Sequence, residues 1–272
     1  MNRNEAMLRE LNLYPQWERK KSAVPTDEQQ APVLVGQSVS GAIVIERKIE
    51  KREAEPVGVH QAANEVKSEL HENPGKFQII APASELGSLS WPQLRQRVHD
   101  CAACKLRTGC MQTVFGVGDE KADWLFVGEG PGAEEDARGE PFVGEAGKLL
   151  DNMLMAIKLQ RGKNVYIANI VKCRPPNNRA PEANEVDACL PYLQRQIVLI
   201  QPRLIVALGK VASNALLGRN ATLGSLRGTL HHYHGIPLVV TYHPAYLLRS
   251  PSEKNKAWQD LCLAVEKMGW EK

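Results

Sequence analysis

The sequence lacks any apolar run long enough to cross a bilayer, and its opening residues lack the central apolar stretch of a secretory signal. The run IVLIQPRLIVAL at residues 197–208 is interrupted by Gln201, Pro202 and Arg203, whereas a membrane-spanning helix needs about 20 apolar residues. The opening MNRNEAMLRELNLYPQWERKK carries charges along its length, unlike a signal peptide. We therefore expect a cytoplasmic protein. Thiols stay reduced in that compartment, so the six cysteines indicate metal or redox chemistry rather than disulfides.

The charge is distributed unevenly along the chain. Residues 1–90 carry 11 Lys/Arg and 13 Asp/Glu, a balance of −2, and the remaining residues have a balance of +5. A modestly basic body suits a phosphate-rich partner. From about residue 23 to residue 83 the chain is rich in Gln, Glu, Lys, Pro and Ser, with no sustained hydrophobic period. We predict that residues 1–89 are a largely disordered extension and that residues 90–272 form the folded domain.

Internal repeats are absent, so the chain is not a repeat architecture. Within the extension, the first 20 residues have the apolar positions of a short amphipathic helix that ends before Pro15. This segment is either a docking peptide for a protein partner or a tail without function, and the sequence favours neither interpretation.

From Ser90 onward, short apolar runs alternate with helical patterns. The segment SWPQLRQRVHDC places Ser90 before Trp91 and a proline in the first turn, which predicts a capped helix. Continuous apolar strands, each followed by a helix, indicate a parallel sheet covered on both faces. We predict an α/β fold, a three-layer α/β/α sandwich with a central, mainly parallel four-stranded sheet. The predicted strands are DWLFVGEG, NVYIANIV, RLIVALG and PLVVTYHP, and the predicted helices are Glu145–Leu159, Glu182–Ile200, Lys210–Leu217 and Lys254–Met268.

Three polar segments follow predicted strands: GEGPG, ANIVKC and TYHPAY. Ligands of α/β sheets bind beyond the carboxyl ends of the strands, so these segments are the expected site. GEGPG does not match the G-x-G-x-x-G dinucleotide loop. GEAGK at residues 144–148 lacks the first glycine of a P-loop.

Four cysteines have spacings that suggest a metal site. Cys101 and Cys104 form a C-x2-C pair, and Cys173 and Cys189 follow much later. A zinc ribbon would need a second close pair, which is absent, and four thiolates from separate segments suit an iron–sulfur cluster at least as well. Spacing alone leaves cluster, zinc and no metal about equally open. Cys110 is expected to be spare, as is Cys262, which is predicted on the apolar side of the last helix.

Three motifs then occur in order with these cysteines: GEGPGAEEDARGEPFVGEAGKLLDNML, NIVKCRPPNNR and TYHPAYLLR. In this combination the chain resembles the family 4 uracil-DNA glycosylases, the [4Fe–4S] members of their superfamily, from about Ser90 to the C-terminus. The resemblance implies that Cys101, Cys104, Cys173 and Cys189 ligate a [4Fe–4S] cluster. It also implies an enzyme that flips deoxyuridine out of DNA and hydrolyses the N-glycosidic bond, which starts base-excision repair.

The resemblance assigns uracil recognition to residues of the three motifs. His243 faces uracil O2 and stabilises the charge that develops there. Asn169 accepts a hydrogen bond from N3–H and donates to O4, and Phe142 stacks on the flipped ring. Small residues let backbone amides approach the base and the flanking phosphate. The expected pocket lining is Gly128, Glu129 and Gly130, with Pro131 and Gly132 toward the DNA.

The group that activates water is less clear from the sequence. Some other glycosylase families have an Asp at the position of Gly130, so that carboxylate is missing here, and family 4 members commonly have Ala there. Glu129 or Glu135 would have to help, or the sugar cation captures water with little base assistance. We place Glu135 at the pocket without a firm role.

DNA contacts are predicted on two loops. Arg174 and Arg179 are placed to meet phosphates, with a solvated surface loop as the alternative. Tyr246 and Leu247 are candidates to wedge into the gap left by the flipped base, and Arg249 to hold a phosphate. For these three the alternative is a plain amphipathic turn that opens the last helix.

The expected function is that of a monomeric enzyme that releases uracil from single- or double-stranded DNA. Two other functions are alternatives to it. One is a protein that holds uracil or abasic DNA without turnover. Some superfamily relatives bind covalently through a histidine in an inserted basic loop, and this chain has no such insert, which favours turnover. The other is an iron–sulfur redox sensor that uses DNA as a scaffold.

Overall fold

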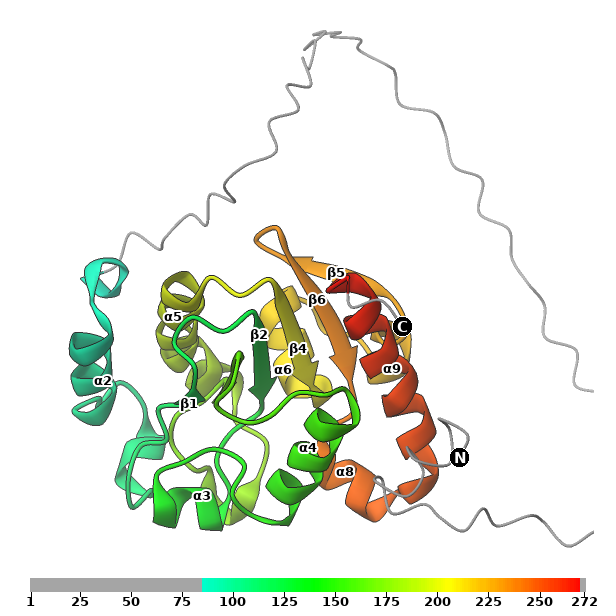
Figure 1. Ribbon diagram of the computed structural model, residues 1–272. Coiled ribbons are helices and arrows are strands. Elements are labelled where there is room, and N and C mark those ends of the chain that lie inside the picture. Colours follow the sequence, from blue (N-terminus) through cyan, green and yellow to red (C-terminus); the bar gives the residue numbers. More distant parts are fainter. Residues whose placement is uncertain (1–84, 270–272) are drawn as a thin grey trace, which may run out of the picture. The chain divides into compact units, whose positions relative to one another are not determined.

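The computed structural model describes residues 85–269 (Figure 1). The predicted extension, including its amphipathic first segment, lies outside the described residues except for residues 85–89. These few residues pack against the body, because Leu89 O accepts hydrogen bonds from Arg195 Nε and Nη2 at 2.8 and 2.6 Å. Within 85–269, no helix combines the length and the apolar character that crossing a membrane requires.

The described residues form one mixed sheet with the strand order β1-β3-β2-β4-β6-β5. The four central strands are parallel, as predicted. The predicted count of four is wrong for the whole sheet, since antiparallel β1 and β5 extend its two edges. The strands are β1 (Val117–Gly118), β2 (Trp124–Gly128), β3 (Val165–Asn169), β4 (Leu204–Leu208), β5 (Leu230–Tyr233) and β6 (Ile236–Thr241).

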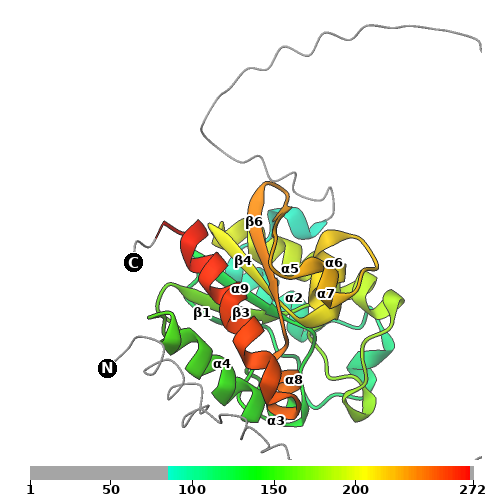
Figure 2. The ribbon, with the colours of Figure 1, turned by 90° about the vertical axis from the view of Figure 1, so that its right-hand side faces the viewer.

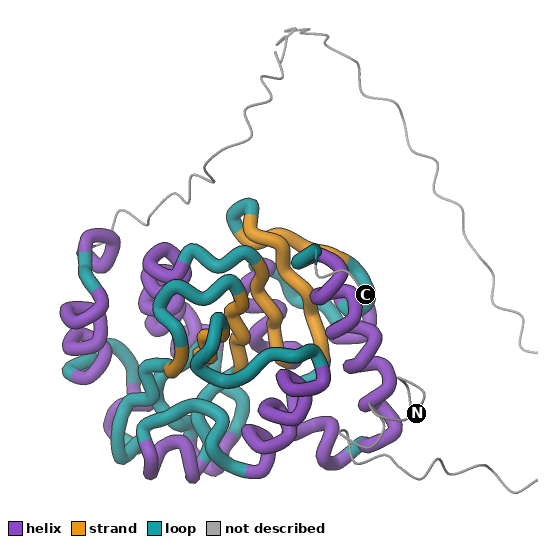
Figure 3. The backbone as a smooth tube through the Cα atoms, in the orientation of Figure 1, coloured by secondary structure: helices purple, strands orange, loops and turns teal. Residues whose placement is uncertain are grey.

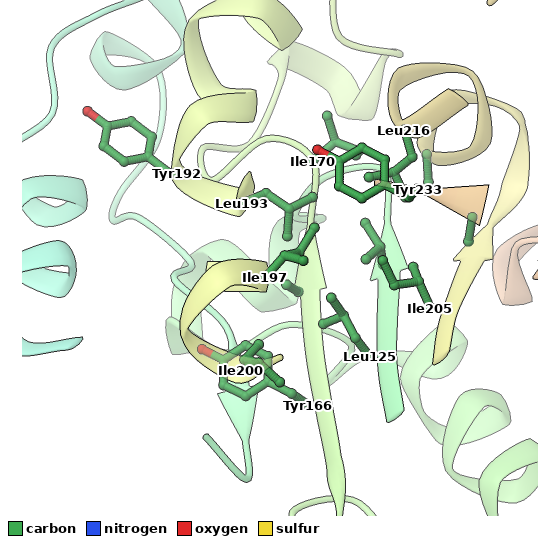
Figure 4. Close-up of a cluster of buried hydrophobic side chains, with 14 of the residues drawn as sticks. Leu125, Tyr166, Ile170, Tyr192, Leu193, Ile197, Ile200, Ile205, Leu216 and Tyr233 are labelled. Atoms are coloured by element: carbon green, nitrogen blue, oxygen red, sulfur yellow. The ribbon is translucent and has the colours of Figure 1, made fainter. Parts of the chain in front are cut away.

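Helices cover both faces of the sheet, which confirms the α/β fold class and its layers (Figure 2). Successive side chains of a strand point to opposite faces: Leu125 and Val127 pack with one helix layer, and Trp124 and Phe126 with the other. Figure 4 shows Leu193 and Ile197 in the same cluster of buried side chains as Leu125. The first layer holds α2 (Trp91–His99), α5 (Ala183–Ile200), α6 (Gly209–Leu217) and α7 (Leu223–Leu226), and the second α4 (Glu145–Ala156), α8 (Pro244–Arg249) and α9 (Lys254–Lys267).

The predicted helices are present with bounds that differ by up to three residues. Helix α2 starts as expected, since Ser90 and Gln93 form a capping box. Helices α7 and α8 and the short α3 (Ala133–Arg138) are additional to the prediction, and Cys262 on α9 is exposed rather than on the apolar side. Four 3₁₀ turns complete the described part: η1 (Glu85–Ser88), η2 (Lys105–Thr108), η3 (Pro176–Asn178) and η4 (Pro251–Glu253).

The order of the strands creates a crevice at the carboxyl edge. Strand β2 lies between β3 and β4. The chain leaves β2 toward β3 on one side of it, and leaves β3 toward β4 on the other side. Such a switch point opens a ligand crevice beyond the strand ends. Figure 3 shows loops gathered at this end of the sheet.

Candidate active site

A cavity of about 520 Å³ lies at this crevice, a size typical of small-ligand sites. Four parallel strands contribute one wall each. Glu129 and the next three residues follow β2, Asn169 ends β3, Gly209 follows β4, and His243 follows β6. Residues that are far apart in the sequence therefore line one pocket.

His243 is held by the helix that it begins. Its Nδ1 accepts a hydrogen bond from the Ala245 backbone N–H at 3.2 Å and so caps α8. Because Nδ1 accepts, the ring proton of the neutral imidazole sits on Nε2. Burial and, to a smaller extent, the nearby charge of Arg249 lower the pKa of His243 to about 4, against an opposing effect of Glu135. The imidazole is therefore neutral near pH 7 and offers an N–H donor.

The neighbouring Gly209 leaves room for this histidine. It has φ of +89°, a conformation that favours glycine. A Cβ at this position would lie 3.0 Å from His243 Cβ, so a larger residue would push the imidazole out of place.

Asn169 presents an unpaired carboxamide oxygen. The residue is 2% exposed, and its Oδ1 has no hydrogen-bond partner among the described residues. Its backbone oxygen accepts from the buried Lys172 Nζ at 3.0 Å, and Lys172 also donates to Gln196 Oε1 at 2.7 Å. A buried acceptor without a partner costs about 1–3 kcal/mol, so this carboxamide is set to receive a donor from a ligand.

Phe142 has a strained backbone and a ring at the pocket. Its φ of +55° is left-handed, which costs a bulky residue about 1–3 kcal/mol. The ring lies 5.4 Å from the ring of His243, centroid to centroid. Gly128 lies behind the ring: a Cβ there would come within 2.5 Å of Phe142 Cζ and would also strike Asn169 Oδ1. Gly128 supports the pocket rather than lining it, contrary to the prediction.

The two candidate carboxylates differ in their surroundings. Burial raises the pKa of Glu129, which lines the pocket. Glu135 also lines the pocket, but its Oε2 accepts from the Gly132 N–H at 3.0 Å, and its Oε1 accepts from the Val143 and Gly144 N–H groups at 3.0 and 3.1 Å. Three amide donors commit Glu135 to holding loops, so Glu129 is the carboxylate that remains available.

The rim of the pocket carries two cations and an exposed aromatic ring. Lys210 and Arg249 are exposed, and neither makes an ion pair within residues 85–269. Tyr246 is 39% exposed and stacks on Tyr242 with the ring centroids 5.2 Å apart. Leu247 is 1% exposed and packs in the core with α4 and α9. The prediction that Leu247 wedges into DNA is therefore wrong, because a helical turn directs it inward.

The loop from Cys173 to Cys189 carries two arginines with different environments. Arg179 lines the pocket, yet both of its terminal nitrogens bind the buried carboxylate of Glu185 at 2.8 and 2.7 Å. That hydrogen bonding lowers the pKa of Glu185 to about 2. Arg174 lies outside the pocket wall, and its Nε donates to Asn178 Oδ1 at 2.8 Å. Arg179 therefore holds its own loop, with much of its charge compensated.

The four candidate cluster ligands line one small cavity. Cys101, Cys104, Cys173 and Cys189 all contribute to its wall. Backbone N–H groups approach two of the sulfurs: Ala103 N lies 3.5 Å from Cys101 Sγ, and Lys172 N lies 3.2 Å from Cys189 Sγ. Within residues 85–269 no three His, Cys, Asp or Glu side chains converge on a single metal-ion position. The four thiols therefore line a shared cavity without converging on the position of a single metal ion.

Comparisons with known proteins identify the family. The model of the uracil DNA glycosylase superfamily matches residues 115–262. The chain is 43% identical over 181 residues to the type-4 uracil-DNA glycosylase of Pyrobaculum aerophilum, which covers 63% of this chain and 91% of that protein. The type-4 enzyme of Archaeoglobus fulgidus is 40% identical over 173 residues, 61% of this chain and 86% of that protein. This chain belongs to the type-4 uracil-DNA glycosylases.

The described residues of this type-4 uracil-DNA glycosylase bring most of the predicted pocket residues together. Glu129, Gly130, Phe142, Asn169 and His243 line one cavity, as do Pro131, Gly132, Tyr246 and Arg249. Sequence reasoning missed Gly209 and Lys210 at the start of α6, and Leu223 on α7. The glycine that follows the predicted strand RLIVALG was the available signal, because it marks a strand end at the same edge.

Proposed function

We propose that this type-4 uracil-DNA glycosylase flips deoxyuridine out of DNA and hydrolyses its N-glycosidic bond, leaving an abasic site. The observation that carries the proposal is the unpaired Oδ1 of Asn169, buried in the same cavity as the Phe142 ring and the neutral His243. A flipped uracil supplies what each group lacks: an N3–H donor, an aromatic face and an acceptor oxygen.

The chemistry of the step assigns one role to each group. Breaking the bond leaves an oxocarbenium-like sugar and a uracil anion, and the Nε2–H of His243 donates to O2 as charge develops there. A neutral donor suits this task because it keeps its proton near pH 7. The pKa of Glu129 is raised by burial, which brings the carboxylate closer to the range in which it can take a proton from water.

The test is incubation with an oligonucleotide containing one uracil, followed by alkali. Strand cleavage with multiple turnover supports the enzyme. A covalent protein–DNA adduct would instead identify a binder that does not turn over. No reaction at all would overturn the proposal and favour a redox sensor.

Duplex or single-stranded DNA would meet the basic rim of the pocket. Lys210 lies at the start of α6, where the helix dipole also favours an anion. Lys210→Ala should weaken binding to all DNA sequences alike and reduce the slope of log Kd against log salt by about 0.9 for duplex DNA. Fluorescence anisotropy at several salt concentrations measures this slope.

The matched control is Lys163→Ala, an exposed lysine just before β3 and therefore at the opposite end of the strands. Its salt slope should equal that of the unchanged protein. If the two variants behave alike, Lys210 makes no phosphate contact and the basic rim acts only through its overall charge.

We further propose that Cys101, Cys104, Cys173 and Cys189 hold a [4Fe–4S] cluster. The type-4 membership supports this ligand set, and so does the arrangement of four thiols from separate segments around one cavity. Backbone N–H groups near two sulfurs suit thiolate ligands. The cluster would supply cross-links that order the 173–189 loop. Its assembly needs reduced thiols, which supports a cytoplasmic location.

Iron content provides the measurement. Protein purified without oxygen should be yellow-brown and contain about four irons per chain. Cys173→Ser should lose both the colour and the fold, because the ligand is buried and closes the loop. Cys110→Ser is the matched control, since Cys110 is partly buried and contacts Arg107 but is not a proposed ligand. A colourless, zinc-loaded and fully active preparation would contradict the cluster.

The catalytic unit is proposed to be the domain that begins near residue 90. We propose that this domain acts as a monomer. The extension before that domain is proposed as the place where a protein partner would bind.

A further inference from the structure

The Phe142 loop is held from two opposite sides. On one side the Glu135 carboxylate accepts hydrogen bonds from the N–H groups of Val143 and Gly144 at 3.0 and 3.1 Å. On the other side the Arg161 guanidinium donates to two carbonyl groups, Nη1 to Pro141 O at 2.9 Å and Nη2 to Phe142 O at 2.7 Å. The backbone on both sides of the left-handed residue is therefore fixed by charged side chains.

Arg161 is itself anchored. Its remaining nitrogen, Nε, lies 2.9 Å from Asp151 Oδ1 on α4. The guanidinium is mostly buried, with 23% of the side chain exposed. All three nitrogens thus have an oxygen partner, an arrangement that uses the planar fork of arginine. A lysine has one nitrogen and cannot reach three separate oxygens with the same geometry.

A glycine on helix α4 completes the arrangement. The Phe142 carbonyl oxygen lies where a Cβ of Gly147 on α4 would be. Gly147 therefore lets this carbonyl approach α4, and Arg161 binds the oxygen there. With its carbonyl fixed, the left-handed conformation of Phe142 (φ +55°) directs the ring to the space between Gly128 and His243.

We infer that Arg161 is a positioning residue for base stacking: together with Asp151 it locks the Phe142 backbone, so that the ring is already in place when a base enters. Arg161 is not among the residues that line the cavity, so it acts through Phe142 and not on the base. The inference rests on the proposed function, because stacking on a flipped uracil gives the ring its purpose.

The test is a double-mutant cycle on a uracil oligonucleotide, with kcat and KM measured separately. Arg161→Lys should lower kcat/KM by about tenfold, because a misplaced ring weakens the orientation of the base. In a Phe142→Leu background the same change should cost less than about twofold, since residues that act as a unit are not additive. The loss should also appear as weaker competitive inhibition by free uracil.

The control is Arg203→Lys, an exposed arginine that pairs with Asp123 at 4.0 Å, before β4. It should change kcat/KM by less than about twofold in either background. Equal losses from Arg161→Lys with and without Phe142 would overturn the inference, because a general structural effect is additive. So would an unchanged kcat/KM in the Phe142 wild-type background.

A second variant covers the case in which Arg161→Lys does not fold. Asp151→Asn removes the anchoring charge and leaves the two carbonyl contacts of Arg161 in place. It should lower kcat/KM by about threefold, again only when Phe142 is present. If the unchanged protein releases no uracil, the proposed function fails. If that protein is active and neither variant couples to Phe142, only the role of Arg161 fails.

Discussion

His243→Ala is expected to lower the turnover of uracil-DNA by about 10²–10³-fold, the usual loss when one preorganised donor to a developing oxyanion is removed. The reason lies in the geometry of the imidazole. Its Nδ1 accepts the Ala245 N–H, so the remaining ring proton points from Nε2 to the ligand. Binding should change much less, because the charge on O2 is small before the bond breaks. Two measurements separate these effects. Single-turnover kinetics give the rate of base release, and binding is measured as Kd for DNA that contains 2′-fluoro-deoxyuridine, whose glycosidic bond resists cleavage.

Loss of the helix cap must be distinguished from loss of the donor. His243→Asn offers an oxygen that can cap α8, since Asn is a preferred N-cap residue, but its shorter side chain cannot reach O2. It should fold like the unchanged protein and still lose turnover. His232→Ala, on the exposed part of β5, should lose neither. Equal losses in binding and turnover for His243→Ala would make His243 a docking residue instead.

The pH dependence follows from the same group. Burial lowers the pKa of His243 from 6.5 to about 4, so the imidazole keeps its neutral form as pH falls through 6.5 and gains a proton only near pH 4. The turnover rate of the unchanged enzyme should therefore have no inflection at 6.5. An acid limb above 4.5 would instead report Glu129, whose pKa is raised by burial.

Asn169→Asp should lose most uracil excision and gain weak, measurable release of cytosine. In the proposed role Asn169 would accept a hydrogen bond from uracil N3–H and donate one to O4, whereas cytosine presents an acceptor at N3 and a donor at N4. Each unpaired buried group costs about 1–3 kcal/mol, so two mismatches support a large rejection of cytosine by the unchanged enzyme. An ionised Asp would place an acceptor oxygen against the acceptor O4 of uracil, which is unfavourable. The same oxygen could accept a hydrogen bond from cytosine N4–H.

Burial affects which form of the introduced Asp carboxyl group meets the base. Position 169 is 2% exposed, which favours the protonated form of a carboxyl group there. In the protonated form the carboxyl group can donate to cytosine N3 and accept from N4–H, and it keeps a partial match to uracil, which accounts for the residual uracil excision. Both release rates are measured on matched oligonucleotides with U or C at one position. Asn255→Asp, on the exposed face of α9, is the control. Full uracil activity in Asn169→Asp would show that Asn169 does not read the base.

The sequence predicts the central sheet well because its signals are local. The runs WLFVG, VYIAN and LIVAL are buried along their whole length, as parallel strands covered on both faces must be. Strand β5 reads LHHY and β1 has two residues, so neither carries a hydrophobic pattern. Both exist because a neighbouring strand offers hydrogen bonds at the edge of the sheet.

The role of a side chain could be predicted from the sequence where a motif specifies the residue. It could not be predicted where tertiary contacts determine the direction or the partners of the side chain. The sequence indicates Asn169 and His243, since Asn169 ends a strand and His243 follows one, each within a recognisable motif. It cannot indicate that Leu247 points into the core while Tyr246 points out, because that depends on the rotation of α8 against α4 and α9. The partners of Glu135 lie eight and nine residues away across a loop, and no local pattern predicts them.

The assembly of the pocket from four strand ends has a consequence for synthesis of the chain. Strand β6, which His243 follows, pairs between β4 and β5, and it is the last of the described strands to leave the ribosome. All four proposed cluster ligands precede it, the last at Cys189. If the four cysteines hold the proposed cluster, all its ligands are therefore made before the proposed leaving-group donor His243. In the proposed mechanism, excision becomes possible only after nearly the whole polypeptide is made, because the strand that positions His243 and the rim residues Tyr246 and Arg249 are all made late.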